Sequence, residues 1–193
     1  MKKLFTRTTV ATAISLFAFN GAAIESADFT ATVEVQNSFD FEVSNGLSFG
    51  TLRTNSDPAE TASIIVSPRG IAAVTSTTGG AAVMSELVAG SPASFTVAGA
   101  SAFATLNLDS SAVAGPIAYK DSAPPGTPGF VLSAPTFYVI TGASPNSVAT
   151  TTIQVDGNGA ATFNMGATLT TTTSTASYLD GTYEGQFTLT LDY

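Results

Sequence analysis

The 193-residue sequence contains no cysteine, no histidine and no tryptophan. Without cysteine the chain has neither a disulfide nor a thiolate nucleophile, although secreted domains often rely on disulfides. Without histidine it lacks the commonest general base and metal ligand. The missing tryptophan removes a common platform for stacking sugars. Stability must therefore come from core burial, strand pairing or oligomerisation.

The first residues have the composition of a secretory signal peptide. Lys2, Lys3 and Arg7 supply a positive start, an apolar stretch follows, and small residues at 21–23 suit cleavage. The apolar stretch is too short for a membrane-spanning helix. We therefore expect residues 1–23 to be removed during export, which leaves one domain-sized chain with room for a real core.

Positive charge is scarce in the rest of the chain. After residue 23 the only bases are Arg53, Arg69 and Lys120, against all 14 acidic residues, so the net charge there is −11. Binding to a phosphate backbone or to an anionic bilayer surface depends on Lys and Arg. The composition therefore predicts no nucleic-acid partner and no direct insertion into a bilayer.

Candidate catalytic groups are few. A serine or threonine nucleophile needs a base nearby, and Lys120 is not part of a Ser-x-x-Lys motif. The carboxylates of Glu34, Asp40 and Glu42 share the polar face of one alternating segment, for which a solvated strand face is the simpler interpretation. We therefore expect no catalytic residues, no cofactor and no enzymatic activity.

Asp156-Gly157-Asn158-Gly159 has some of the composition of a calcium-binding loop. The EF-hand pattern requires a glutamate at the twelfth position, where this chain has Ala167. Val155 and Phe163 bracket the segment, which favours a hairpin turn with glycine in left-handed conformations. We therefore expect no metal site.

The remainder has the pattern of an all-β protein. Short β-branched or aromatic runs alternate with Gly, Pro, Ser and Asn, which is typical of an antiparallel β-sandwich or barrel. The predicted strands are 29–35, 39–43, 47–52, 62–66, 71–76, 81–89, 95–98, 102–108, 130–132, 137–140, 151–155, 163–169 and 183–193. Asn45-Gly46 predicts a turn before 47–52, Pro124–Gly129 predicts an exposed loop, and 81–89 also fits a short helix.

Two alternating segments lie at the ends of this region. The apolar faces comprise Phe29, Ala31, Val33, Val35, Phe39, Phe41 and Val43 in the first, and Tyr183, Gly185, Phe187, Leu189, Leu191 and Tyr193 in the last. A period of two predicts strands with one buried face. Asn37 interrupts the first face and divides it into two strands. No following hairpin can pair the last strand, so we expect its partner earlier in the chain or in another molecule.

This end pattern resembles that of chaperone–usher pilus subunits, and more specifically the bacterial domain-of-unknown-function 4402 (DUF4402) family of fimbrial-like secreted proteins. The matching segments are Leu47–Leu52, Phe95–Gly99, Gly159–Leu169 and Gly181–Tyr193. The resemblance implies an immunoglobulin-like sandwich over residues 38–193, completed by a strand from a neighbouring subunit. Residues 24–37 would be the N-terminal extension that supplies such a strand to a neighbour.

The resemblance also implies residue roles and partners. Phe29, Ala31, Val33 and Val35 would form the donated face, and Phe187, Leu189, Leu191 and Tyr193 the edge that accepts a neighbour's strand. A periplasmic chaperone would cover that edge during export, and an outer-membrane usher would assemble copies of this chain or related subunits at the cell surface. The expected function is a structural fimbrial subunit that contributes to adhesion or biofilm.

Two alternatives remain open from the sequence. Outer-membrane β-barrels also end in an aromatic residue behind an alternating apolar strand, but they need about eight strands of roughly ten residues with aromatic girdles. Most strands predicted here are shorter. A secreted carbohydrate-binding or adhesive module is the other alternative, although the sequence places no glycan site.

Overall fold

The computed structural model describes residues 30, 32, 38–70, 74–77 and 80–193. The chain divides into a unit of residues 1–35 and a unit of residues 36–193. Only Thr30 and Thr32 of the first unit are described, and both are exposed. The predicted signal peptide and the four predicted donor residues Phe29, Ala31, Val33 and Val35 lie outside the described residues. All of the described strands lie in the second unit.

The described residues form strands joined by turns and loops, and contain no helix. The strands are β1 (Asp40–Asn45), β2 (Thr51–Asn55), β3 (Ala62–Val66), β4 (Val74–Thr77), β5 (Val83–Val88), β6 (Ala93–Ala98), β7 (Thr105–Asp109), β8 (Gly115–Tyr119), β9 (Phe130–Thr141), β10 (Ser147–Ala149), β11 (Thr152–Gln154), β12 (Ala161–Thr171), β13 (Tyr183–Glu184) and β14 (Thr190–Asp192). Within this part of the chain there is accordingly no helical segment with the length and hydropathy to cross a membrane.

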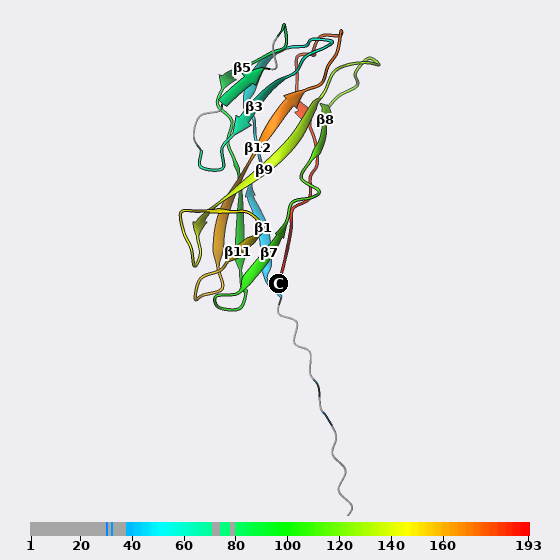
Figure 1. The fold of residues 1–193 in the computed structure, drawn as a ribbon. Coiled ribbons are helices and arrows are strands. Elements are labelled where there is room, and N and C mark those ends of the chain that lie inside the picture. Colours follow the sequence, from blue (N-terminus) through cyan, green and yellow to red (C-terminus); the bar gives the residue numbers. More distant parts are fainter. Residues whose placement is uncertain (1–29, 31, 33–37, 71–73, 78–79) are drawn as a thin grey trace, which may run out of the picture. The chain divides into compact units, whose positions relative to one another are not determined.

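The two longest strands, β9 and β12, form the middle of a large antiparallel sheet (Figure 1). The strand order is β1-β6-β12-β9-β8-β13, with β3 paired to the second half of β12 and β10 to the second half of β9. A three-stranded sheet, β11-β7-β14, and the pair β2-β5 complete the fold. The predicted all-β antiparallel sandwich is therefore confirmed.

The main core lies between the large sheet and the β11-β7-β14 sheet. Phe163 of β12 is fully buried and stacks on Phe95 of β6, with ring centroids 5.1 Å apart. Leu106 of β7 and Ile153 of β11 belong to the same cluster and are at most 1% exposed. A second, smaller core joins β3 and the end of β12 to β5, through Ile64, Leu169 and other side chains. Packing of inward-facing side chains from opposed sheets is what holds a sandwich together.

Strands β1 and β2 form one long antiparallel ladder with β6 and β5. The register runs from the pair Asp40 and Ala98, through an isolated bridge between Ser48 and Ser91, to Asn55 and Val83. A Cβ at Gly50 would meet the backbone of residues 88–90, so glycine is needed where these two chain segments approach closely.

The Asn45-Gly46 turn prediction is wrong as a hairpin. The ladder shifts register between Val43 and Asn45, which is a β-bulge, and the chain then continues along the same partner. An Asn-Gly pair favours a hairpin only locally, and here the long-range pairing with residues 83–98 decides the path.

The predicted strands 130–132 and 137–140 are one strand, β9. Pro135 and Ala134, whose φ is +49°, lie where the pairing with β12 shifts register between Gly166 and Thr168. A bulge accommodates a proline that would otherwise remove a ladder hydrogen bond. The strand prediction at 62–66 is confirmed, as is a strand rather than a helix within 81–89. Strands β8 and β10 are not predicted from the sequence.

Candidate functional site

The last alternating segment, residues 183–193, pairs with an earlier part of its own chain. Tyr183 pairs with Tyr119 of β8, and Leu191 pairs with Leu108 of β7. The segment therefore starts as the edge strand of the large sheet and ends in the three-stranded sheet. Its partner strands β7 and β8 are joined by the loop at residues 110–114. The side chain of Val113 in this loop is buried in the main core.

The prediction of one uninterrupted strand over 183–193 is wrong. The regular pairing is limited to β13, which lies along β8, and to β14, which lies along β7. Among the described residues no ladder includes Gly185 to Leu189. The backbone of this short stretch therefore takes no part in regular strand pairing within the described part of the chain.

The alternation of side chains in this segment is nevertheless kept. Phe187, Leu189 and Leu191 are partly buried and pack against the main core, while Gln186, Thr188 and Thr190 are exposed. None of the three apolar side chains reaches the burial of the core proper. Their inner face is therefore only half covered.

Strand β1 has the same incomplete cover at the edge of the large sheet. Val43 is directly paired with Phe95, so the two side chains project from the same face of the sheet. Phe95 is 5% exposed, whereas Val43 is 63% exposed. Phe41, on the same face, is partly buried and stacks on Phe95 with ring centroids 5.6 Å apart. The core-facing side of β1 thus extends beyond the strands that cover β6.

The two edges meet at one end of the sandwich. The rings of Phe39 and Tyr193 are in edge-to-face contact, with centroids 5.3 Å apart. The N–H of Ser101 donates to the Tyr193 hydroxyl at 3.3 Å, and the side-chain amide of Asn107 donates to the main-chain oxygen of Tyr193 at 2.9 Å. In Figure 1 the start of β1 lies next to the C label.

We name these side chains the half-covered strip: Phe39, Phe41, Val43, Phe187, Leu189, Leu191 and Tyr193. It contains all four residues that the sequence assigns to the acceptor edge. The structure adds the three residues of the β1 side, whose alternation was recognised in the sequence but not assigned to the site. The signal that connects them is the shared apolar period of the first and last segments.

Polar groups outside the strip are paired or exposed. Lys120 and Glu184 form an ion pair at 2.8 Å, with about half of each side chain exposed. Asp40 and Glu42 lie on exposed positions of β1, and Glu34 lies outside the described residues. In the described ranges no group of three or more acidic side chains is placed to hold a metal ion.

The Asp156–Gly159 segment is a tight turn, but it does not join paired strands. Asp156 Oδ1 accepts hydrogen bonds from the N–H groups of Asn158 at 2.8 Å and Ala160 at 3.0 Å. These bonds, the one from Ala160 first, lower the pKa of the Asp156 carboxyl. Gly159 has a φ of +73°, as predicted, but β11 and β12 belong to different sheets, so the hairpin prediction is wrong.

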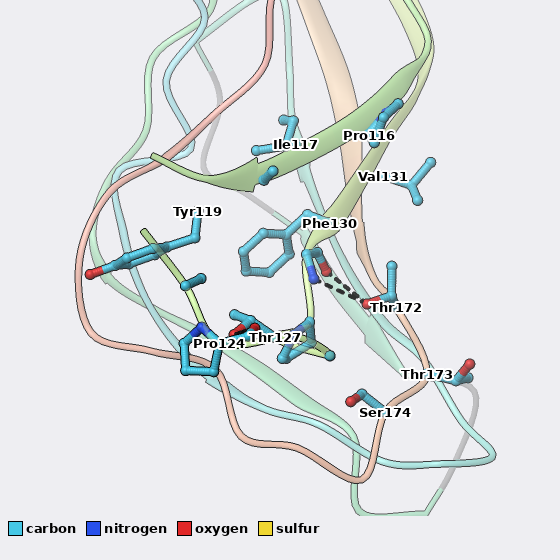
Figure 2. A pocket seen from close by; sticks show the side chains of 15 residues that line it. Pro116, Ile117, Tyr119, Pro124, Thr127, Phe130, Val131, Thr172, Thr173 and Ser174 are labelled. Atoms are coloured by element: carbon cyan, nitrogen blue, oxygen red, sulfur yellow. Dashed lines mark hydrogen bonds between the residues drawn. The ribbon is translucent and has the colours of Figure 1, made fainter. Parts of the chain in front are cut away.

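A pocket of about 490 Å³ lies at the opposite end of the sandwich from Tyr193. Its walls come from β8, the loop at 123–129, the start of β9 and residues 172–174. Figure 2 shows Tyr119 on one side, Thr172 and Ser174 on the other, and Phe130 between them. Thr172 Oγ1 accepts from the N–H of Gly129 at 3.3 Å and donates to its C=O at 3.0 Å. Most of the wall is apolar, because it is lined by residues such as Pro116, Ile117 and Phe130. The Thr172 hydroxyl already makes both of its hydrogen bonds to Gly129.

No family model, curated protein or solved structure matches this chain. The interpretation of the half-covered strip consequently depends on its geometry, and the likeness to pilus subunits stays a prediction from the sequence.

Proposed function

We propose that this protein is a structural subunit of a surface fibre, which polymerises when the N-terminal extension of one copy is added as a strand to the half-covered strip of the next. The observation that carries the proposal is the coincidence of unpaired backbone at Gly185–Leu189 with the half-buried Phe187 and Leu189. Strand addition needs both features, because backbone bonds supply affinity and alternate side chains fill the apolar strip.

Covering the strip makes a substantial favourable contribution to the free energy of association. Fully burying one large apolar side chain contributes roughly 1.5–3 kcal/mol, so completing the burial of about half of the seven side chains of the strip contributes roughly 5–10 kcal/mol. New backbone hydrogen bonds to Gly185–Leu189 add to this, each by about 1 kcal/mol. An uncovered strip would instead leave an apolar sheet edge exposed in every free subunit.

The proposed donor matches the strip in period and length. As an extended strand, residues 29–35 would span about 20 Å, which equals the length of the edge from Phe187 to Tyr193, and the whole extension of residues 24–37 would span about 46 Å. If Phe29–Val35 runs antiparallel to Phe187–Tyr193, four apolar donor side chains alternate along the four predicted acceptor residues. During export, a strand from a periplasmic chaperone would cover the strip until an outer-membrane usher exchanges it for the extension. The resulting fibre would serve adhesion or biofilm formation at the cell surface.

A deletion tests the donor role. We expect a chain without residues 24–35 to remain folded and monomeric and to form no SDS-resistant ladder, while the chain with the intact extension does. A synthetic peptide of residues 24–37 should bind the truncated protein and raise its Tm. The matched control is the same peptide with Val33→Asp and Val35→Asp, which should bind weakly because two charges would enter an apolar strip. Ladders from the truncated protein would contradict the donor assignment.

Microscopy tests the function itself. Negative-stain images of cells that express the protein should show thin fibres, and cells that lack it should not. A cell surface unchanged by removal of the protein would contradict the proposed role.

A further inference from the structure

Phe103 is a large aromatic side chain exposed at the Tyr193 end of the sandwich. It is 62% exposed, and its φ of +57° is unusual for a bulky residue. Its N–H donates to the C=O of Asp156 at 3.0 Å, and its C=O accepts from the side-chain amide of Gln154 at 3.1 Å. A Cβ at Gly157 would lie 3.2 Å from its ring, so the ring rests on that turn. The surrounding turns therefore hold an exposed ring in a strained backbone position, which is a feature typical of functional surfaces.

The pocket around Phe130 lies at the opposite end of the large sheet from Phe103. Strand β12 connects the two ends: Ala161 follows the turn on which Phe103 rests, and Thr171 precedes the pocket residue Thr172. The strand separates them by about 33 Å. One copy cannot therefore bring its own Phe103 into its own pocket, but a neighbouring copy can.

The direction of the donated strand decides which ends of two copies meet, and this step depends on the proposed function. The last segment of the chain runs toward the end that carries Tyr193 and Phe39, and β1, which follows the extension, starts at that end. A donor parallel to the last segment would leave the strip at this end, so that the Tyr193 ends of two copies would face each other, and the two copies would close into a pair when each donates its strand to the other. An antiparallel donor leaves toward the pocket end, and this arrangement repeats into a fibre.

The register of an antiparallel donor brings the two surfaces close together. When residues 29–35 lie along residues 193–187, residue 38 of the donor copy comes beside Glu184 of the acceptor copy. Glu184 is next to Tyr183, which pairs with the pocket residue Tyr119. The donor's Phe39, and with it the end that carries Phe103, therefore comes close to the acceptor's pocket.

We propose that in the fibre Phe103 of each copy inserts into the pocket formed by Tyr119, Pro124, Phe130 and Thr173 of the next copy. The cavity of about 490 Å³ accommodates a phenyl ring. The contact is heterologous, since different surfaces of the two copies meet, and it therefore propagates along a fibre. It would limit bending between subunits that are otherwise joined through a single strand.

Engineered disulfides test the contact, because the natural chain has no cysteine to interfere. The full chain carries Phe103→Cys together with either Ala123→Cys or Thr173→Cys, both in the pocket wall. Assembled fibres are oxidised, boiled in SDS to separate strands that are held without covalent bonds, and run without reductant. The matched control replaces Phe103→Cys by Val148→Cys, because Val148 is 72% exposed and lies on the lateral strand β10.

We expect covalent ladders from at least one pair that includes residue 103, their loss on reduction, and none from the Val148 pairs. Fibres that form without a covalent ladder from either pair would overturn the end contact and leave the proposed function intact. If the unsubstituted protein forms no fibres, the proposed function is wrong, and so is the contact that depends on it.

Fibre flexibility supplies a second test. Phe103→Asn removes the ring and keeps a residue that tolerates positive φ. We expect its fibres to keep their SDS-resistant ladder but to have a shorter persistence length in negative-stain images, with Val148→Asn as the control. Fibres of Phe103→Asn that are as straight as those of the natural sequence would overturn the contact.

Discussion

Val43 and Phe95 are directly paired across the β1–β6 ladder and share one face of the sheet, yet Val43 is 63% exposed and Phe95 only 5%. The difference arises from the width of the opposing layer, which covers β6 and leaves the edge strand β1 partly uncovered. An added strand beside the last segment would cover this position. The difference in exposure between Val43 and Phe95 therefore marks the position where the sandwich is incomplete.

We expect Val43→Asp to block polymerisation without unfolding the subunit. The free subunit should lose less than about 1 kcal/mol of unfolding free energy, since the position is mostly exposed. The SDS-resistant ladder should disappear, because an added strand would bury the carboxylate without a partner. Urea unfolding of the monomer and gel analysis of the assembled material measure the two effects.

The matched control for this variant is Val148→Asp, which places the same charge at another exposed strand position. It should leave both the unfolding free energy and the ladder nearly unchanged. A ladder that survives Val43→Asp would show that β1 takes no part in the acceptor site.

The central aromatic stack predicts a large loss on truncation. Phe163 is fully buried and lies against Phe41, Phe95 and Phe137. Phe163→Ala should lower the unfolding free energy by about 3–5 kcal/mol through lost burial and the cavity that remains. Chemical denaturation measures this loss. The exposed Phe103→Asn is the comparison, and a similar loss for both would contradict the assigned core.

Two glycines with similar backbone angles predict different costs. Gly159 and Gly99 have φ of +73° and +77°. A Cβ at Gly159 would meet the Ala100 backbone, whereas a Cβ at Gly99 has open space around it. Gly99→Ala should cost about 1 kcal/mol from backbone strain, and Gly159→Ala clearly more, since the backbone must also move. Equal Tm values for the two variants would contradict this close approach.

Acid should weaken the turn at Asp156. Backbone N–H groups of Ala160 and Asn158 lower the pKa of this carboxyl in the folded state. Its contribution to stability is therefore present above the unfolded pKa of about 3.9 and is lost as the pH falls through the folded pKa. Asp156→Asn should reduce the loss of stability between about pH 7 and about pH 3, as measured by urea midpoints. Asp40→Asn, on exposed β1, is the control, and an equal reduction in that variant would exclude the turn as the cause.

Local patterns predict the strands well where pairing follows the same period. Ala62–Val66 is a strand with the predicted bounds, and Phe187, Leu189 and Leu191 keep the predicted inner face. Predictions that depend on the choice of partner are less successful. Asn45-Gly46 favours a hairpin by its own chemistry, but pairing with residues 83–98 turns it into a bulge.

The same distinction applies to the candidate site. The acceptor residues are recognisable in the sequence because apolar and polar residues alternate along consecutive positions. The role of Val43 cannot be recognised from the sequence, because the exposure of its side chain depends on how far the opposing sheet extends. The gap at Gly185–Leu189 likewise depends on where the last segment changes its partner from β8 to β7. The position of Pro135 within a strand is likewise not predictable from local sequence. β9 accommodates this proline because its pairing with β12 has a bulge there.

The order of amino acids is enough to predict an all-β sandwich, the apolar faces of its two end segments, and a surface chemistry dominated by negative charge. These properties depend on period and composition, which are local and additive. The folded chain was needed to decide which strands pair, where the last strand is interrupted, and which inward-facing side chains stay uncovered. Those outcomes depend on register between distant segments and on the relative widths of two packed sheets, and neither quantity is contained in any single stretch of sequence.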